Sequence, residues 1–135
     1  MPILTVLIGR PPDTTLARQV ADDLLGLTAD ILGKRADLVA IALQFVDRSH
    51  WFIGGQAVAE GGKATAFVEI RITDETNTKE QKARWIAAVH AALAERLGSL
   101  HDTSYVQVQD VRAAAWGYGG RTQEARLHAP HAVGF

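Results

Sequence analysis

The chain has 135 residues, a formal net charge of −1 and no cysteine. Its length suits one domain with a buried core, and a charge near zero provides no general attraction for nucleic acid or an anionic membrane. The lack of cysteine excludes disulfides, thiol nucleophiles and cysteine-bound metals. No apolar run reaches the length of a membrane span. The N-terminus lacks the basic region of a secretory signal, so we expect a cytoplasmic protein.

The first half of the chain has the pattern of a strand, a helix and a second strand. Residues Ile3 to Ile8 (ILTVLI) are apolar and rich in β-branched side chains, which is typical of a buried strand. Asp13, Thr14 and Thr15 can each cap the start of a helix that ends at Gly33. Leu38 to Val46 (LVAIALQFV) predicts the second strand. The helix should present one apolar face, made by Leu16, Val20, Leu24, Leu27 and Ile31. A helix between two buried strands predicts a βαβ unit with a parallel pair.

The second half repeats this order. Thr65 to Thr73 (TAFVEIRIT) alternates between apolar and polar residues as a strand does, and Thr78 with Gln81 forms a candidate capping box. The helix that follows is expected to end at Gly98, and Ser104 to Val111 (SYVQVQDV) predicts the fourth strand. The apolar face of this second helix is expected to consist of Ile86, Val89, Leu93 and Leu97.

Each half closes with a similar segment, HWFIGGQ at residues 50–56 and AWGYGGR at residues 115–121, and the two align without gaps. We therefore expect an α/β fold in which duplicated βαβ units form a four-stranded sheet with two helices on one face. The domain is expected to cover residues 1–121, with repeats at 1–56 and 64–121 and a C-terminal tail at 122–135. Because the strands look apolar on both sides, the open face of the sheet predicts an oligomer, and closed symmetry favours a trimer or a larger ring.

Several motifs are similar to those of one known family in order and spacing. His50 to Gly55 (HWFIGG) resembles the HFGIGG stretch of 4-oxalocrotonate tautomerase. In the second half, Tyr105, Gln107 and Asp110 follow the run LAERL with the spacing of the branch that contains macrophage migration inhibitory factor. The pair Gly33–Lys34 falls where that branch carries a Gly-Lys pair at the end of a helix. The chain therefore resembles the tautomerase superfamily over nearly its whole length except the tail.

This resemblance implies a cofactor-independent tautomerase that uses an N-terminal proline as its catalytic base. Pro2 takes that place if Met1 is removed, and Lys34 would contact the substrate acid. Tyr105 and Gln107 would line the active site of a neighbouring subunit in a homotrimer. The resemblance thus places the active sites at subunit interfaces.

Three positions depart from the patterns of the family. Gln107 stands where the migration inhibitory factor branch has asparagine, and Ala40 stands where 4-oxalocrotonate tautomerase has an arginine. The third expected strand and the residues after it offer Arg71, but not the pair of arginines that the dehalogenase branches place there. The resemblance therefore indicates the fold more firmly than the substrate.

Elementary chemistry supports a terminal amine as the base. A free α-amino group has a reference pKa near 8, and burial or a nearby cation lowers that pKa, which suits a general base near pH 7. Pro2 can provide such a nitrogen only without Met1, and the alternative is a proline that merely opens a strand. Lys34 could equally complement the dipole at the C-terminal end of a helix.

Further side chains are candidates for the pocket. Arg10 follows the first strand and Arg71 lies within the third, and either could hold a carboxylate, although a solvated loop and an interface salt bridge explain them as well. Trp51 could wall the pocket and keep it dry, or simply pack. Tyr105 and Gln107 share a strand face, and their alternative is a polar contact between strands at the trimer seam.

We therefore predict an isomerase that moves a proton in a small 2-keto or enol acid, with no cofactor and no nucleic-acid or membrane partner. Two alternatives stay open. One is a hydratase or dehalogenase of small unsaturated acids, in which Asp110 would activate water, and the other is a non-catalytic binding protein on the same scaffold. The histidines at positions 50, 90, 101, 128 and 131 have no metal-ligand spacing, so we predict no metal site.

Overall fold

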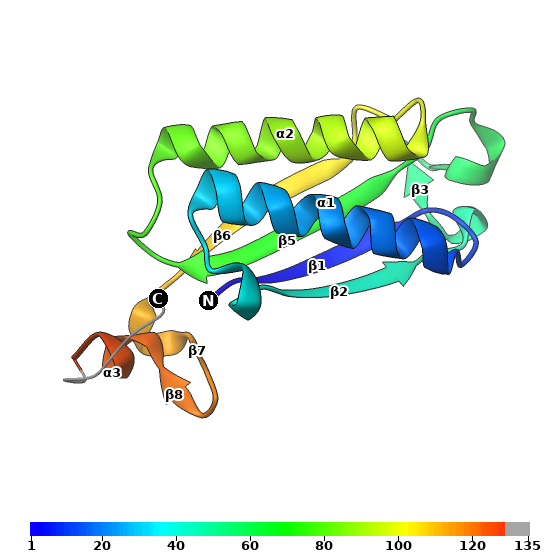
Figure 1. Ribbon diagram of the computed structural model, residues 1–135. Helices are drawn as coiled ribbons and strands as arrows, with labels where there is room; N and C mark the ends of the chain where they lie inside the picture. The colour runs from blue at the N-terminus through cyan, green and yellow to red at the C-terminus, as the bar shows by residue number, and fades with distance from the viewer. Residues whose placement is uncertain (129–135) are drawn as a thin grey trace.

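Four strands form one sheet, and two long helices cover one of its faces (Figure 1). The computed structural model describes residues 1–128, so positions 129–135 of the expected tail, with His131 among them, lie outside the described residues. The duplicated α/β architecture predicted from the sequence is confirmed. The strands are β1 (Ile3–Ile8), β2 (Ala40–Phe45), β5 (Ala66–Thr73) and β6 (Tyr105–Val111), and the helices are α1 (Thr14–Leu32) and α2 (Lys79–Leu97).

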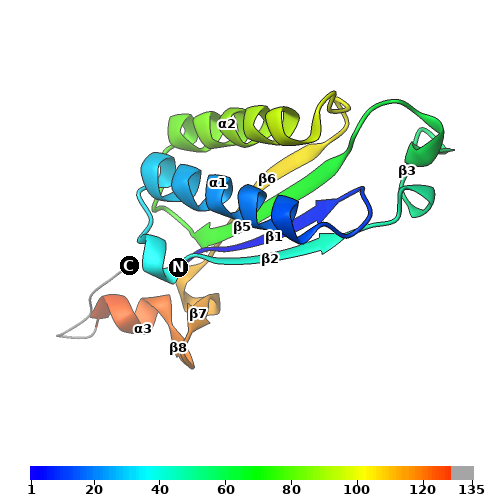
Figure 2. The ribbon, with the colours of Figure 1, turned by 45° about the vertical axis from the view of Figure 1, so that its right-hand side comes forward.

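The strand order, β2-β1-β5-β6, places the N-terminal end of β1 beside the C-terminal end of β5. β1 and β2 are parallel, and so are β5 and β6, whereas β1 and β5 are antiparallel. In this register Ile3 lies opposite Arg71, and Ile8 lies opposite Ala66. Figure 2 shows the same arrangement from the side, with α1 and α2 next to each other above the sheet. The loop after β5 therefore reaches the beginning of the chain, although the two are far apart in the sequence.

Both long helices begin and end as the sequence predicts. The Asp13 carboxylate accepts a hydrogen bond from the Leu16 backbone N–H at 3.0 Å and caps the start of α1. The helix ends at Gly33, whose φ of 67° is a left-handed conformation that favours glycine. The start of α2 carries the predicted capping box between Thr78 and Gln81.

The core lies between the helices and the sheet, and one predicted core position is wrong. On α2 the buried stripe runs through Trp85, Val89 and Leu93, and the Trp85 side chain is fully buried. Ile86, which the spacing places on this face, is instead 37% exposed. Both positions fit the helical spacing to Val89. The indole of Trp85 can be buried because its N–H donates to the buried Thr28 hydroxyl of α1 at 3.2 Å.

The face of the sheet away from the helices is only partly apolar, which corrects the expectation of strands that are apolar on both sides. Leu7 and Phe67 lie on this face, but strict alternation along β5 and β6 also brings polar side chains to it. These polar residues are Glu69, Arg71, Gln107 and Gln109. A subunit that covered this face would therefore have to match polar and charged groups as well as apolar ones.

The two halves repeat each other with a shift of 65 residues, which separates α1 from α2 at both ends. The same shift relates two β-hairpins at opposite ends of the sheet (Figure 1). The φ angles at the hairpin tips agree as well, with 60° and 78° at Gly54 and Gly55 and again at Gly119 and Gly120. Two successive positive φ angles suit a Gly-Gly turn. The hairpins are β3 (Phe52–Ile53) with β4 (Gln56–Ala57), and β7 (Gly117–Tyr118) with β8 (Arg121–Thr122).

Short helical segments connect these elements. The 3-10 helices η2 and η4 precede the two hairpins at equivalent places, and α3 (Gln123–His128) follows β8 within the expected tail. The Gln123 side chain is buried, and its backbone N–H donates to the Trp116 carbonyl at 2.7 Å, which holds α3 against the hairpin. The 3-10 helices are η1 (Ala36–Leu38), η2 (Arg48–His50), η3 (Val58–Glu60) and η4 (Ala113–Ala115).

Candidate active site

The predicted site residues fall into two groups at opposite ends of β1. Pro2 directly precedes the strand, and Arg71 lies beside Ile3 in the neighbouring strand. Lys34 joins this end, since its charge acts on the terminal amine of Met1. One chain therefore brings Pro2, Lys34 and Arg71 to the same end of the sheet.

The other candidates lie elsewhere in the chain. Arg10 follows the far end of β1, and Trp51 lies next to Gly9 there. Tyr105 begins β6 at the same end and is 65% exposed, and Gln107 lies two residues further along that strand. A single chain does not bring these four residues to Pro2.

The terminal amine lies in unusual surroundings. Met1 and Pro2 are both buried, and Met1 is only 8% exposed. Burial, and then the positive charge of Lys34, lower the pKa of the Met1 amine from 8.0 to about 6. Both causes disfavour the ammonium form. This end of the chain thus holds an amine that is mostly neutral at pH 7.

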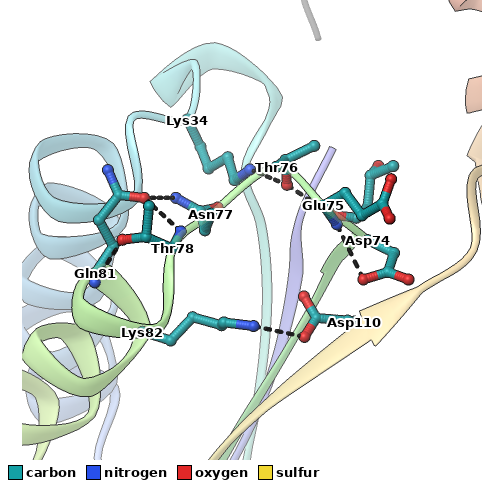
Figure 3. A network of polar contacts seen from close by, with 10 residues as sticks. Lys34, Asp74, Glu75, Thr76, Asn77, Thr78, Gln81, Lys82 and Asp110 are labelled. Carbon is teal, nitrogen blue, oxygen red and sulfur yellow. Dashed lines mark hydrogen bonds and ion pairs between the residues drawn. The ribbon is translucent and has the colours of Figure 1, made fainter.

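Lys34 is held in place by the loop after β5 (Figure 3). It directly follows the left-handed Gly33 and is only 9% exposed. Its Nζ donates to the Thr76 hydroxyl at 3.0 Å, and that hydroxyl donates to the Thr73 carbonyl at 2.6 Å. Burial lowers the pKa of Lys34, and the Asp110 carboxylate acts in the opposite direction. The ammonium is therefore held by the Thr76 hydroxyl, while burial and Asp110 have opposite effects on its pKa.

The same loop is tied to the end of α1. The Asn77 side-chain amide donates to the Leu32 carbonyl at 2.9 Å and to the Gln81 side chain at 3.0 Å. Beneath the loop, Lys82 and Asp110 form an ion pair at 2.8 Å (Figure 3). These contacts link the C-terminal end of α1 to the N-terminal end of α2, with Lys34 between them.

Sequence reasoning missed Thr76 and Asn77. Both follow a strand of the second half, and nothing in their local pattern points to Lys34. Only the antiparallel pairing of β1 with β5 brings this loop to the N-terminus. A sequence-based signal would have required the strand order, which the repeat alone does not specify.

Trp116 is a second residue that sequence reasoning missed. Its indole N–H donates to the Met1 carbonyl at 2.9 Å. Trp116 occupies the same place in the second half as Trp51 does in the first, because the two closing segments align without gaps. A signal was therefore available. The duplication pairs each hairpin with the strand start of the other half, which puts Trp116 rather than Trp51 at Pro2 within one chain.

Two predicted arginines have partners within the chain. Arg10 donates from its guanidinium to the Leu97 carbonyl at the end of α2, at 2.6 Å. Arg71 pairs with Glu69 at 2.8 Å on the open face of the sheet, where the arginine side chain is about half exposed. Lys34 is the cation whose charge lowers the pKa of the Met1 amine.

The described residues offer neither a metal-binding cluster nor a membrane-spanning helix. Within residues 1–128, no three His, Cys, Asp or Glu side chains come together as a set of metal ligands. Over the same part of the chain, no helix combines the length and the apolar character needed to cross a membrane.

Comparison with known proteins identifies the family of this fold and site. A family model described as "Tautomerase enzyme" matches residues 67–126. A curated relative, "Probable tautomerase K2" of Dickeya dadantii (strain 3937), is 40% identical over 60 residues, which are 44% of this chain and 90% of the relative. The chain belongs to the tautomerase family.

Solved tautomerase structures extend the match to both halves. A native fused 4-OT is 25% identical and superposes with a TM-score of 0.82 over 91% of this chain and 97% of the other. A fused 4-OT described as an asymmetric trimer has a TM-score of 0.80 at 21% identity, with the same coverage. Macrophage migration inhibitory factor of Toxoplasma gondii superposes with a TM-score of 0.72 at 19% identity, over 89% and 98% of the two chains. The last two likenesses show the fold.

The family model and the terminal amine fall on different halves of the chain. The match to residues 67–126 covers the second unit, whereas Pro2 opens the first. The second unit contributes Thr76 and Trp116 to the end of the sheet where Pro2 lies. The candidate site is therefore assembled from both units.

Proposed function

We propose that this chain is a cofactor-independent tautomerase that moves a proton in a small 2-keto or enol acid. The observation that carries the proposal is the place where Pro2 precedes β1, because burial and the charge of Lys34 there lower the pKa of the Met1 amine to about 6. A Pro2 amine exposed at this place by removal of Met1 would be largely a free base at neutral pH and could accept a proton from carbon. Membership of the tautomerase family supports the same class of chemistry.

Pro2 would supply the base after removal of Met1. While Met1 is present, the Pro2 nitrogen belongs to an amide and has no useful basicity. The Pro2 carbonyl accepts a hydrogen bond from the Ala40 backbone N–H at 3.2 Å, so pairing with β2 fixes the position of the ring. The new amine would lie one residue deeper in the same surroundings, where burial and Lys34 favour its neutral form.

In the proposed reaction, the Pro2 nitrogen takes a proton from the carbon next to the substrate carbonyl. The electrons of that C–H bond form a C=C bond, and the carbonyl π electrons move to oxygen, which gives an enolate. The Pro2 ammonium then returns the proton to the oxygen or to another carbon. The Lys34 ammonium would bind the substrate carboxylate as a point charge.

We also propose a homotrimer that brings the remaining candidates to the site. Solved fused 4-OT proteins are described as trimers, and the exposed Tyr105 is available to a neighbouring subunit. Tyr105 and Gln107 of a neighbour would line the pocket, and Arg10 and Trp51 could reach it only from a neighbour as well. Arg71 would assist Lys34 only by leaving Glu69. Gel filtration at the mass of one chain would contradict the trimer.

The decisive experiment measures the intact mass and the tautomerase activity of the same purified protein. We expect the purified protein to lack the mass of Met1 and to convert phenylpyruvate or 2-hydroxymuconate. Pro2→Ala should lower kcat at least about 100-fold, because positioned general bases contribute that much or more. Pro12→Ala is the matched control, since Pro12 is exposed and precedes α1 at the far end of β1. Equal rates for wild type and Pro2→Ala, or complete retention of Met1, would rule out this mechanism.

A further inference from the structure

The Trp116 side chain makes a hydrogen bond whose position bears on the reaction. Its indole N–H donates to the Met1 carbonyl oxygen at 2.9 Å, although the two residues are 115 positions apart. The backbone of Trp116 lies between η4 and β7, and its carbonyl accepts a hydrogen bond from the Gln123 backbone N–H. These contacts hold the residue in place independently of Met1.

The acceptor of this bond, the Met1 carbonyl oxygen, lies next to the Pro2 nitrogen, which is the proposed base. The Met1 carbonyl carbon is bonded to the Pro2 nitrogen, so its oxygen lies about 2.3 Å from that nitrogen by ordinary peptide geometry. A substrate that gives a proton to Pro2 must bring its carbon to within about 3 Å of the same nitrogen. Its carbonyl oxygen, two bonds from that carbon, would then also lie close to the nitrogen. The Met1 carbonyl therefore lies in the region that a substrate would enter once Met1 is removed.

We propose that in the processed enzyme the Trp116 indole N–H donates a hydrogen bond to the carbonyl oxygen of the substrate and to the enolate oxygen formed from it. This role rests on the proposed function. The indole keeps its proton throughout, and the charge that develops on the oxygen strengthens the bond as Pro2 takes the proton from carbon. A donor that is already aimed at the developing charge stabilises the transition state without reorganisation.

The chemistry of the residue fits this role. Indole nitrogen is only a donor, so it cannot compete for the proton that Pro2 moves. Lys34 would hold the carboxylate of a 2-keto acid while Trp116 holds the neighbouring oxygen, and the two groups come from different units of the fold. The equivalent tryptophan, Trp51, lies beside Gly9 at the other end of β1, where the chain continues and offers no amine.

The test uses the processed protein with three variants. Trp116→Phe keeps an aromatic ring and removes the N–H, and we expect kcat on phenylpyruvate to fall about thirtyfold, between the values typical of a charged hydrogen bond and an oxyanion-hole donor. Tyr118→Phe, which removes only a hydroxyl from β7 of the same hairpin, is the control and should leave kcat within twofold. The melting temperature of Trp116→Phe should stay near that of the wild type, because Trp116 is only partly buried and phenylalanine keeps an aromatic ring. Pro2→Ala establishes whether the measured activity depends on Pro2.

A binding measurement keeps this inference separate from the proposed function. The Trp116 indole ¹H–¹⁵N signal should shift when phenylpyruvate binds and should shift much less with 3-phenylpropanoate, which has the acid but no keto group. If Trp116→Phe retains kcat within twofold while Pro2→Ala is inactive, the role of Trp116 is wrong and the proposed function stands. If the wild type has no activity, the proposed function fails. Equal shifts of the indole signal with phenylpyruvate and 3-phenylpropanoate would show that Trp116 does not bind the keto oxygen.

Discussion

The two ends of β1 are built on one plan but offer a substrate different groups. At each end, a loop from the other half donates a hydrogen bond to the last helical carbonyl. Asn77 binds Leu32 of α1 at one end, and Arg10 binds Leu97 of α2 at the other. Both ends therefore keep a hydrogen bond to the last carbonyl of a long helix, but the donor side chain differs between them.

The difference in chemistry follows from the start of the chain. The residues equivalent to Met1 and Pro2 are Ala66 and Phe67, which lie inside a continuous strand, and the residue equivalent to Lys34 is Ser99. One end thus combines an amine with a buried cation, and the other end has neither. The comparison teaches that a duplicated unit can keep its architecture while only one copy keeps the elements of a site.

Among the changes that test the contrast between the two ends, removal of the Lys34 charge should have the largest effect. Lys34→Met keeps most of the length of the side chain but loses its charge, and we expect kcat/KM for phenylpyruvate to fall roughly 100-fold, the upper end for a hydrogen bond to a charged group. Ser99→Ala, the same position at the other end, should change kcat/KM less than twofold. Steady-state kinetics of the two variants measure this contrast, and equal effects would show that the two ends do not differ in function.

A smaller effect should follow from loosening Lys34. Thr76→Val removes the hydroxyl that accepts from the ammonium, and we expect kcat/KM to fall about fivefold, the value of one ordinary hydrogen bond. The hydroxyl stabilises the charged form, so its loss should lower the pKa of Lys34 further and move the alkaline limb of the pH profile to lower pH. The other charged groups at this lysine are the terminal amine and Asp110, which is paired with Lys82.

Thr76→Ser serves as the matched variant for this prediction. It keeps the hydroxyl, so it should restore both the rate and the alkaline limb of the wild type. A loss of thermal stability in Thr76→Val without any change in the pH profile would mean that Thr76 holds the loop and does not tune Lys34.

The smallest effect concerns stability and applies to chains that retain Met1. The amine binds a proton with a pKa near 8 when unfolded and about 6 when folded. Between these values the unfolded chain binds more protons, so acidification from pH 8 to pH 6 should favour unfolding and lower the urea midpoint. An Nα-acetylated chain has no amine to titrate and should lack this component. The same slope in both forms would contradict the lowered pKa.

Much of the fold was predictable because the signals are local. Asp13, Gly33 and the pair Thr78–Gln81 all take the capping roles that their spacing indicates. The choice between Trp85 and Ile86 was not predictable in this way, since both fit the helical period. Burial of Trp85 depends on an acceptor from another helix, Thr28, and no pattern within α2 reports it.

Some residues of the candidate site also have local sequence signals, whereas others depend on contacts between distant parts of the chain. Pro2 and Lys34 could be proposed from the sequence, because Pro2 directly precedes the first strand and the Gly33–Lys34 pair directly follows the first helix. Thr76 could not, because its nearness to Lys34 arises from the antiparallel pairing of β1 with β5. The repeat marks Trp116 as the equivalent of Trp51, but its nearness to Met1 depends on the same pairing. Contacts that depend on how two units face each other are invisible to reasoning that treats each unit alone.

The peptide bond between Met1 and Pro2 has a consequence for how the protein is made. Under the proposed function, a chain that folds before Met1 is removed keeps that residue at the site, held by Trp116 and covalently joined to the base. That residue acts as an inhibitory propeptide of the shortest possible length. Maturation by an aminopeptidase then becomes the activation step, and the processed fraction of a preparation sets its specific activity.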